Sequence, residues 1–207
     1  MSNISNTITP PFLTSRIIVI SDFNCPYCFT LNEWLYELGA SHRVRWVGIE
    51  HRPELPSFGQ NTAVDHQTLT TEVEDVKIRA PEVEVAQPET WINTHYALLY
   101  QNAIEDDDPE RAPLIRRAIF QAYWRDNKFI SNEETIKKLY LEQGVLFPEL
   151  EPEYLRELSA WWKVNLDRIP CLIAPTGISH LGLQDKRAVS AFLNSALRET
   201  NAGPGCL

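Results

Sequence analysis

The hydrophobic pattern near the start of the chain changes from continuous to helical. Residues 16–23 (RIIVISDF) form an unbroken apolar and β-branched run, which is typical of a strand buried on both faces. Apolar side chains from Leu31 to Leu38 then recur at helical spacing, and Gly39 stands where a helix commonly ends. A second β-rich run, residues 43–50, follows. This order predicts a βαβ unit with two parallel strands.

The middle of the chain, residues 67–167, has a helical pattern. Apolar side chains share one helical face in four segments, which centre on Val73, Ile119, Leu139 and Leu158. A further helix is predicted over residues 91–104, and the acidic stretch 105–110 (EDDDPE) reads as a solvated turn. Ser131 followed by Glu134 predicts a capping box in front of the third segment.

After this helical block the pattern returns to strands. Residues 171–174 and 178–183 flank a Pro-Thr-Gly turn and predict a β-hairpin, and residues 185–199 predict a last helix. We therefore expect one α/β domain in two halves with an all-helical insertion between them. The expected boundaries are 14–56 and 166–200 for the halves, 57–165 for the insertion, and 1–13 and 201–207 for loose termini.

Composition and charge narrow the class of partner. The chain has 207 residues, of which 43% are hydrophobic and 23% charged, as in an ordinary globular protein. The net charge of -9, without a long Lys/Arg cluster, argues against a nucleic acid or an anionic membrane surface as partner. The start of the chain has no basic segment followed by an apolar one, and residues 17–20 are too few to span a bilayer. We expect a cytoplasmic protein.

Two of the four cysteines, Cys25 and Cys28, are separated by only Pro26 and Tyr27. If the strand runs directly into the helix, Cys25 lies at the first helical turn, where free N–H groups and the helix dipole stabilise a thiolate. Cys28 lies one turn further on and could resolve a mixed disulfide. Pro26 suits a helix start because it has no N–H there. The spacing therefore favours a dithiol redox pair.

A zinc site and a coincidence are the alternatives for this pair. Zinc needs two further clustered ligands, whereas Cys171, Cys206 and the five histidines are scattered singly, so no metal is expected. Asn24 is the expected N-cap of the helix. Asp22 reads as a turn residue, with a proton relay to Cys28 as the alternative. The preceding strand offers no acid as a proton acceptor for Cys28.

Ile169 and Pro170 directly precede the strand that Cys171 opens. A proline is tolerated at the first residue of a strand, so this pair needs no functional reading. Cys171 is most simply a small buried hydrophobe, although its position also makes it a candidate accessory thiol. Cys206 lies in a Gly-Pro-Gly tail and reads as an exposed thiol.

Four segments of the chain resemble the DsbA family of the thioredoxin superfamily, and within it the FrnE-like and 2-hydroxychromene-2-carboxylate isomerase-like branch. They are SDFNCPYCF, RRAIFQAYWRDNKFISNEETIKKL, RIPCLIAPTG and LGLQDKRAVSAFL. The resemblance implies a thioredoxin-like fold with a helical insertion. It also implies that Cys25 is the attacking thiolate and Cys28 the resolving thiol, with Pro26 and Tyr27 tuning both.

The resemblance further implies that Pro170 is a cis proline that faces the cysteines. Ile169 would then offer backbone hydrogen bonds to a substrate. Tyr27 stands where strongly oxidising members of the family have histidine, so no imidazolium lies beside Cys25. We therefore expect a reduction potential in the glutaredoxin range, roughly -200 to -230 mV.

The leading function is a thiol-disulfide oxidoreductase acting on a disulfide- or thiol-containing protein or small molecule. No bound cofactor is expected, with glutathione a candidate co-substrate, and the resemblance is compatible with a homodimer. The first alternative is a glutathione-dependent isomerase or transferase of the hydroxychromene-carboxylate isomerase or kappa-class type, whose counterpart of Cys25 is typically serine. The second is a binding or chaperone module with cysteines that serve as a redox switch.

Overall fold

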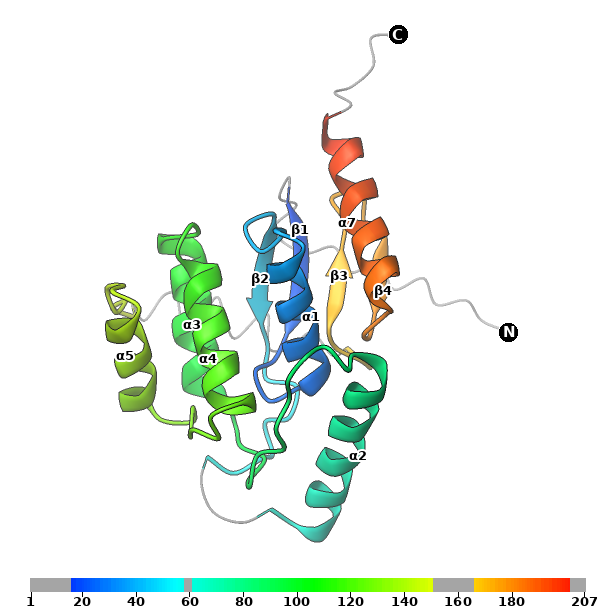
Figure 1. Ribbon diagram of the computed structural model, residues 1–207. Helices are drawn as coiled ribbons and strands as arrows, with labels where there is room; N and C mark the ends of the chain where they lie inside the picture. The colour runs from blue at the N-terminus through cyan, green and yellow to red at the C-terminus, as the bar shows by residue number, and fades with distance from the viewer. Residues whose placement is uncertain (1–15, 58–60, 151–165, 202–207) are drawn as a thin grey trace, which may run out of the picture.

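The computed structural model describes residues 16–57, 61–150 and 166–201. In these residues one four-stranded sheet is accompanied by six helices (Figure 1). The strands are β1 (Ile17–Ser21), β2 (Val44–Gly48), β3 (Cys171–Ile173) and β4 (Ser179–Leu181). The helices are α1 (Pro26–Glu37), α2 (Ala63–Arg79), α3 (His95–Asp107), α4 (Ala112–Trp124), α5 (Glu133–Glu142) and α7 (Lys186–Asn201).

The sheet has the strand order β2-β1-β3-β4 and mixed direction. β1 and β2 are parallel, in register from Ile17 opposite Val44 to Ser21 opposite Gly48, while β3 is antiparallel to both β1 and β4. All five residues of β1 are buried, as its continuous apolar run predicts. The predicted α/β fold, with β-α-β before the helical insertion and β-β-α after it, is confirmed.

Helices α2 to α5 stand between β2 and β3 in the chain and share one core with the sheet. The ring of Phe23, just after β1, lies 4.9 Å from the ring of Trp46 in β2 and 4.6 Å from that of Phe120 in α4. In Figure 1, α2 lies at the end of the sheet where α1 begins, while α3 and α4 lie beyond β2. Aromatic packing thus fixes the insertion against the strand that leads to Cys25.

One buried ion pair joins three helices in this core. The guanidinium of Arg116 in α4 is completely buried and binds the carboxylate of Glu105 in α3. The same guanidinium donates to the side-chain oxygen of Asn32 in α1 at 2.9 Å. Because a buried charge without a partner is costly, this group holds the three helices in one arrangement.

Two predicted helix starts were wrong. The helix predicted from Trp91 begins at His95, because residues 91–94 form no regular structure and are bonded elsewhere. It continues to Asp107, into the predicted turn. The third predicted helix is capped by Asn132, whose side chain accepts from the Thr135 N–H at 2.8 Å. Ser131 instead donates to the carbonyl of Ser57. The predicted helix around Leu158, like Cys206, lies outside the described residues.

Candidate active site

Cys25 is the last residue before α1. Its backbone is extended, with φ -103° and ψ 118°, and Pro26 begins the helix. The carbonyl of Cys25 accepts from the Phe29 N–H at 3.1 Å, so Cys25 is the N-cap residue. The prediction that Asn24 would cap the helix was wrong, since its side chain donates to the carbonyl of Ile92 at 3.1 Å.

The two thiols of the pair differ in their access to the surface. Cys25 is 7% exposed and Cys28 only 1%, and both are free thiols. Cys25 lines a cleft of about 470 Å³, whereas Cys28 lies behind it in the helix. A substrate in the cleft can therefore reach the sulfur of Cys25 directly, and that of Cys28 only through Cys25.

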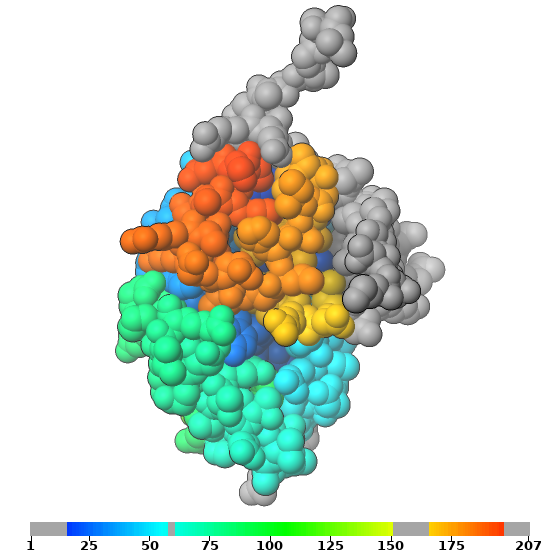
Figure 2. Space-filling view, turned by 90° about the vertical axis from the view of Figure 1, so that its right-hand side faces the viewer, coloured from blue at the N-terminus to red at the C-terminus, as the bar shows by residue number. Residues whose placement is uncertain are grey.

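The cleft lies between two parts of the chain that are far apart in sequence. Figure 2 shows early, blue residues at the bottom of a hollow between α2 below and the β3–β4–α7 region above. Ile169, Leu181 and Leu183 contribute apolar side chains to the upper wall. Such a mixed apolar and charged groove can accept an extended polar molecule with its sulfur over Cys25.

The Ile169–Pro170 peptide bond is cis, as the resemblance implies. Ile169 lines the cleft together with Cys25 and Tyr27, so the structure brings these three predicted residues together. Pro26, Cys28, Pro170 and Cys171 do not line it. Cys171 lies in β3 opposite Ile20, and its burial raises its pKa to about 11.

The pKa of Cys25 is raised well above its usual value, chiefly by burial. The neighbouring thiol of Cys28, to which it is hydrogen-bonded, and the carboxylate of Glu72 raise it further, while the backbone N–H of Cys28 acts in the opposite direction. Burial thus acts against the stabilisation that the helix N-terminus offers a thiolate at this position.

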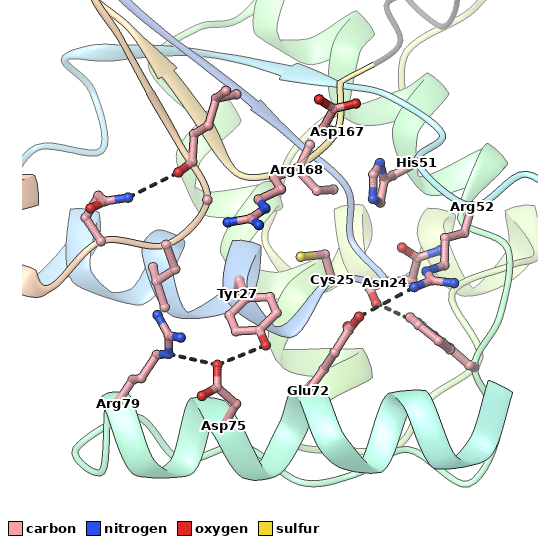
Figure 3. A pocket seen from close by; sticks show the side chains of 16 residues that line it. Asn24, Cys25, Tyr27, His51, Arg52, Glu72, Asp75, Arg79, Asp167 and Arg168 are labelled. Carbon is pink, nitrogen blue, oxygen red and sulfur yellow. Dashed lines mark hydrogen bonds and ion pairs between the residues drawn. The ribbon is translucent and has the colours of Figure 1, made fainter. Parts of the chain in front are cut away.

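Helix α2 contributes charged side chains that the sequence did not indicate as part of the site. The hydroxyl of Tyr27 donates to Asp75 at 3.0 Å, and Asp75 also binds Arg79 at 2.8 Å. Burial and the Asp75 carboxylate raise the pKa of Tyr27, so this phenol stays neutral and acts as a hydrogen-bond donor. Figure 3 shows Tyr27 directed from α1 toward this helix.

A second contact between α2 and the cleft involves Glu72, one turn before Asp75. The carboxylate of Glu72 lies 3.5 Å from the guanidinium of Arg52, which packs over the ring of Trp91 at 4.2 Å from its centroid. In Figure 3, Glu72 rises from α2 below Cys25. The insertion thereby places an acidic side chain in the cleft that Cys25 lines.

Two indole groups hold the loop that carries Cys25. The Nε1–H of Trp91 donates to the carbonyl of Asn24 at 2.7 Å, and that of Trp124 donates to the carbonyl of Phe23 at 2.8 Å. Both carbonyls belong to the segment between β1 and Cys25. A buried indole N–H usually finds a hydrogen-bond acceptor. This general need was the one sequence-level indication that these tryptophans would bind the loop.

Asp22 is completely buried beside the same loop, rather than a simple turn residue. Its carboxylate accepts from the His51 N–H at 2.8 Å and from the hydroxyl of Thr94. Burial raises the pKa of Asp22 to about 6. The side chain thus joins the end of β1 to the segment after β2 and to the start of α3. In the sequence, the signal for this linking role was the position of an acidic residue between a buried strand and the cysteine pair.

Within the described part of the chain, His, Cys, Asp and Glu side chains form no group of three or more that could hold a metal ion. The same residues include no helix that is both long and apolar enough to cross a membrane.

Solved structures with the same architecture include proteins of thiol and disulfide chemistry. A structure from Nitrosomonas europaea, provisionally described as a protein disulfide isomerase, matches with a TM-score of 0.71 and 16% identity, over 88% of this chain and 97% of that one. The chain has a DsbA-like thioredoxin fold. The cytosolic disulfide reductase DsbM from Pseudomonas aeruginosa matches with a TM-score of 0.62 and 13% identity, over 89% of this chain and 99% of that one.

A third neighbour is a 2-hydroxychromene-2-carboxylate isomerase, with a TM-score of 0.62 and 12% identity over 91% of this chain and 99% of that one. DsbM also matches in a structure with glutathione. Comparison of the sequence with protein-family models and with curated proteins gives no match. At these identities the neighbours establish the fold of this chain.

Proposed function

We propose that the protein is a thiol-disulfide oxidoreductase in which Cys25 attacks and Cys28 resolves. The observation that carries the proposal is the unequal access of the two thiols: Cys25 faces the cleft and Cys28 is buried one helical turn behind it. Ile169, across the cleft, belongs to the segment that would contact the substrate backbone.

The reaction proceeds in two exchanges. The Cys25 thiol loses its proton, its thiolate attacks one sulfur of a substrate disulfide, and the departing thiolate takes up a proton. Cys28 then loses its proton and attacks the sulfur of Cys25, which releases the second substrate thiol and leaves a Cys25–Cys28 disulfide. Two electrons and two protons pass to the substrate, and the dithiol becomes a disulfide.

Reduction of the substrate is the favoured direction. A strong oxidant needs a stabilised Cys25 thiolate in its reduced form, whereas burial and Glu72 destabilise that thiolate here. Tyr27, a neutral phenol, adds no positive charge. These features support a potential in the glutaredoxin range, roughly -200 to -230 mV, rather than that of DsbA. A reductant of this kind belongs in a reducing compartment, which agrees with a cytosolic site of action.

Glutathione is the proposed source of electrons for regeneration. Arg52, Arg79 and Arg168 place guanidinium groups around the cleft, and such groups bind carboxylates such as those of glutathione. The cytosolic reductase DsbM has this fold and is known with glutathione. An isomerase or transferase that activates glutathione itself is less well supported, because a second nucleophile, Cys25, occupies the cleft.

Redox titration and substrate assays test the proposal together. The wild-type protein and the Cys25→Ser variant are equilibrated with defined glutathione buffers, then assayed for insulin reduction and for oxidative refolding of a scrambled protein. We expect the wild-type protein to reduce insulin and the Cys25→Ser variant to show no insulin reduction. Full activity of Cys25→Ser, or a potential above about -150 mV, contradicts the proposal.

A further inference from the structure

The structure points to a role in the dithiol reaction for one residue of the insertion. We propose that Glu72 is a positioning residue that α2 carries into the cleft, where its carboxylate opposes the negative charge that Cys25 acquires as a thiolate and so slows its attack on a disulfide. This inference rests on the proposed oxidoreductase function. It assigns to the helical insertion a control over the reactivity of the cysteine pair.

The first support is the position of Glu72 relative to Cys25 in the cleft. Glu72 and Cys25 line the same cleft although 47 positions separate them, and Figure 3 shows Glu72 directed from α2 toward the level of Cys25. The Glu72 side chain is only 23% exposed, so solvent screens its charge less than that of a surface carboxylate. A like charge in such a site disfavours ionisation of the thiol.

The second support is the ion pair that the Glu72 carboxylate forms with Arg52. Burial raises the pKa of the Glu72 carboxyl, and the guanidinium of Arg52 acts against that shift. Arg52 lies 3.5 Å from the carboxylate and is itself held over the ring of Trp91. This contact is long for a hydrogen bond, and it compensates the carboxylate only in part. The Glu72 carboxylate accordingly still contributes to raising the pKa of Cys25.

The size of the effect follows from two opposing changes. Removing a nearby negative charge lowers the pKa of a thiol by about one unit, so that about tenfold more of it is thiolate at neutral pH. The same change makes the thiolate about threefold less nucleophilic, since nucleophilicity falls with a Brønsted coefficient of about 0.4 to 0.5. The gain in thiolate exceeds the loss in nucleophilicity. Cys25 of the Glu72→Gln variant should therefore attack a disulfide about threefold faster.

The chain offers a matched control on the same helix. Glu74 lies two residues after Glu72, is 58% exposed, and pairs with Lys77 at 2.7 Å. Glu74→Gln removes one negative charge from α2 outside the cleft, whereas Glu72→Gln removes it inside. Glu72→Asp keeps the charge on a shorter side chain and separates the effect of charge from that of packing.

The experiment measures Cys25 in two ways. Peptide mass spectrometry follows its alkylation by iodoacetamide from pH 7 to pH 12, and stopped-flow kinetics follow its reaction with the neutral bis(2-hydroxyethyl) disulfide at pH 7. In Glu72→Gln we expect the inflection of alkylation to fall by about one pH unit and the disulfide reaction to become about threefold faster. Glu74→Gln should match the wild type, and Glu72→Asp should stay closer to the wild type than to Glu72→Gln.

An unchanged inflection in a folded Glu72→Gln variant overturns the inference. A slower disulfide reaction in that variant also overturns it, because it would make Glu72 a base that accepts the proton of Cys25. If the inflection shifts while the wild-type protein reduces no disulfide, the proposed oxidoreductase function fails and the effect of Glu72 on Cys25 stands. The alkylation measurement thus separates the two claims.

Discussion

Replacing Asp22 by asparagine should remove a specific dependence of stability on pH. Asp22 is completely buried at the end of β1, three residues before Cys25, and its pKa rises from 3.8 to about 6 on folding because of burial. The folded protein therefore binds this proton more tightly than the unfolded chain. Stability from this group is complete below the unfolded pKa of 3.8 and is lost as the pH rises through about 6.

The magnitude follows from the two pKa values. A difference of about two units, at 1.36 kcal/mol for each unit, is worth about 3 kcal/mol between the fully protonated and fully ionised limits. Between pH 4.5 and pH 7.5 the same values give a change of about 2 kcal/mol. The asparagine side chain of the variant would not titrate, and its amide could still accept from the His51 N–H and donate to the hydroxyl of Thr94.

Urea unfolding of the wild type and Asp22→Asn between pH 4.5 and pH 7.5 measures this difference. The stability of the variant relative to the wild type should increase by about 2 kcal/mol from the lowest to the highest pH. Asp126→Asn, at a half-exposed aspartate, is the control and should show no such trend. A difference between Asp22→Asn and wild type that stays constant with pH would refute the assignment of a raised pKa to Asp22.

Three further predictions address the core and the site. Arg116→Met should lower the free energy of unfolding by about 3 to 5 kcal/mol in urea titrations, because the Glu105 carboxylate loses its buried partner. Gly48→Ala should cost about 1 to 3 kcal/mol in the same assay, since the added Cβ would lie 2.6 Å from the Leu98 side chain. Tyr27→His should raise the reduction potential measured in glutathione buffers, because an imidazolium beside Cys25 stabilises its thiolate. An unchanged or lower potential would show that Tyr27 does not set it.

The fold was predictable where the local pattern and the buried environment agree. The continuous apolar run of β1 predicts a strand covered on both faces, and the periodic apolar residues of α4 and α5 predict helices. The start of α3 was not predictable, because long-range hydrogen bonds hold the non-helical residues before it. The N–H of Trp91 donates to Asn61, and that of Asn93 donates to the carbonyl of Pro56.

The candidate site also contains residues that the sequence predicts and residues that only the structure identifies. The Cys25–Cys28 pair and the Ile169–Pro170 pair are local motifs, and each can be identified from a short stretch of sequence. Tyr27 meets Asp75 across 48 positions, and the carboxylate of Glu72 reaches the cleft from the same helix. Periodicity identifies α2 as a helix but does not show which element it packs against, so its polar contribution to the cleft needed the structure.

Trapping of the mixed disulfide tests the central claim most directly. The Cys28→Ser variant is incubated with oxidised glutathione, and the adduct is located by peptide mass spectrometry, with Cys25→Ser as the matched variant. If Cys25 attacks and Cys28 resolves, Cys28→Ser accumulates one glutathione on Cys25, and Cys25→Ser accumulates none on Cys28. An adduct on Cys28 in Cys25→Ser, or none on Cys25 in Cys28→Ser, would contradict the account.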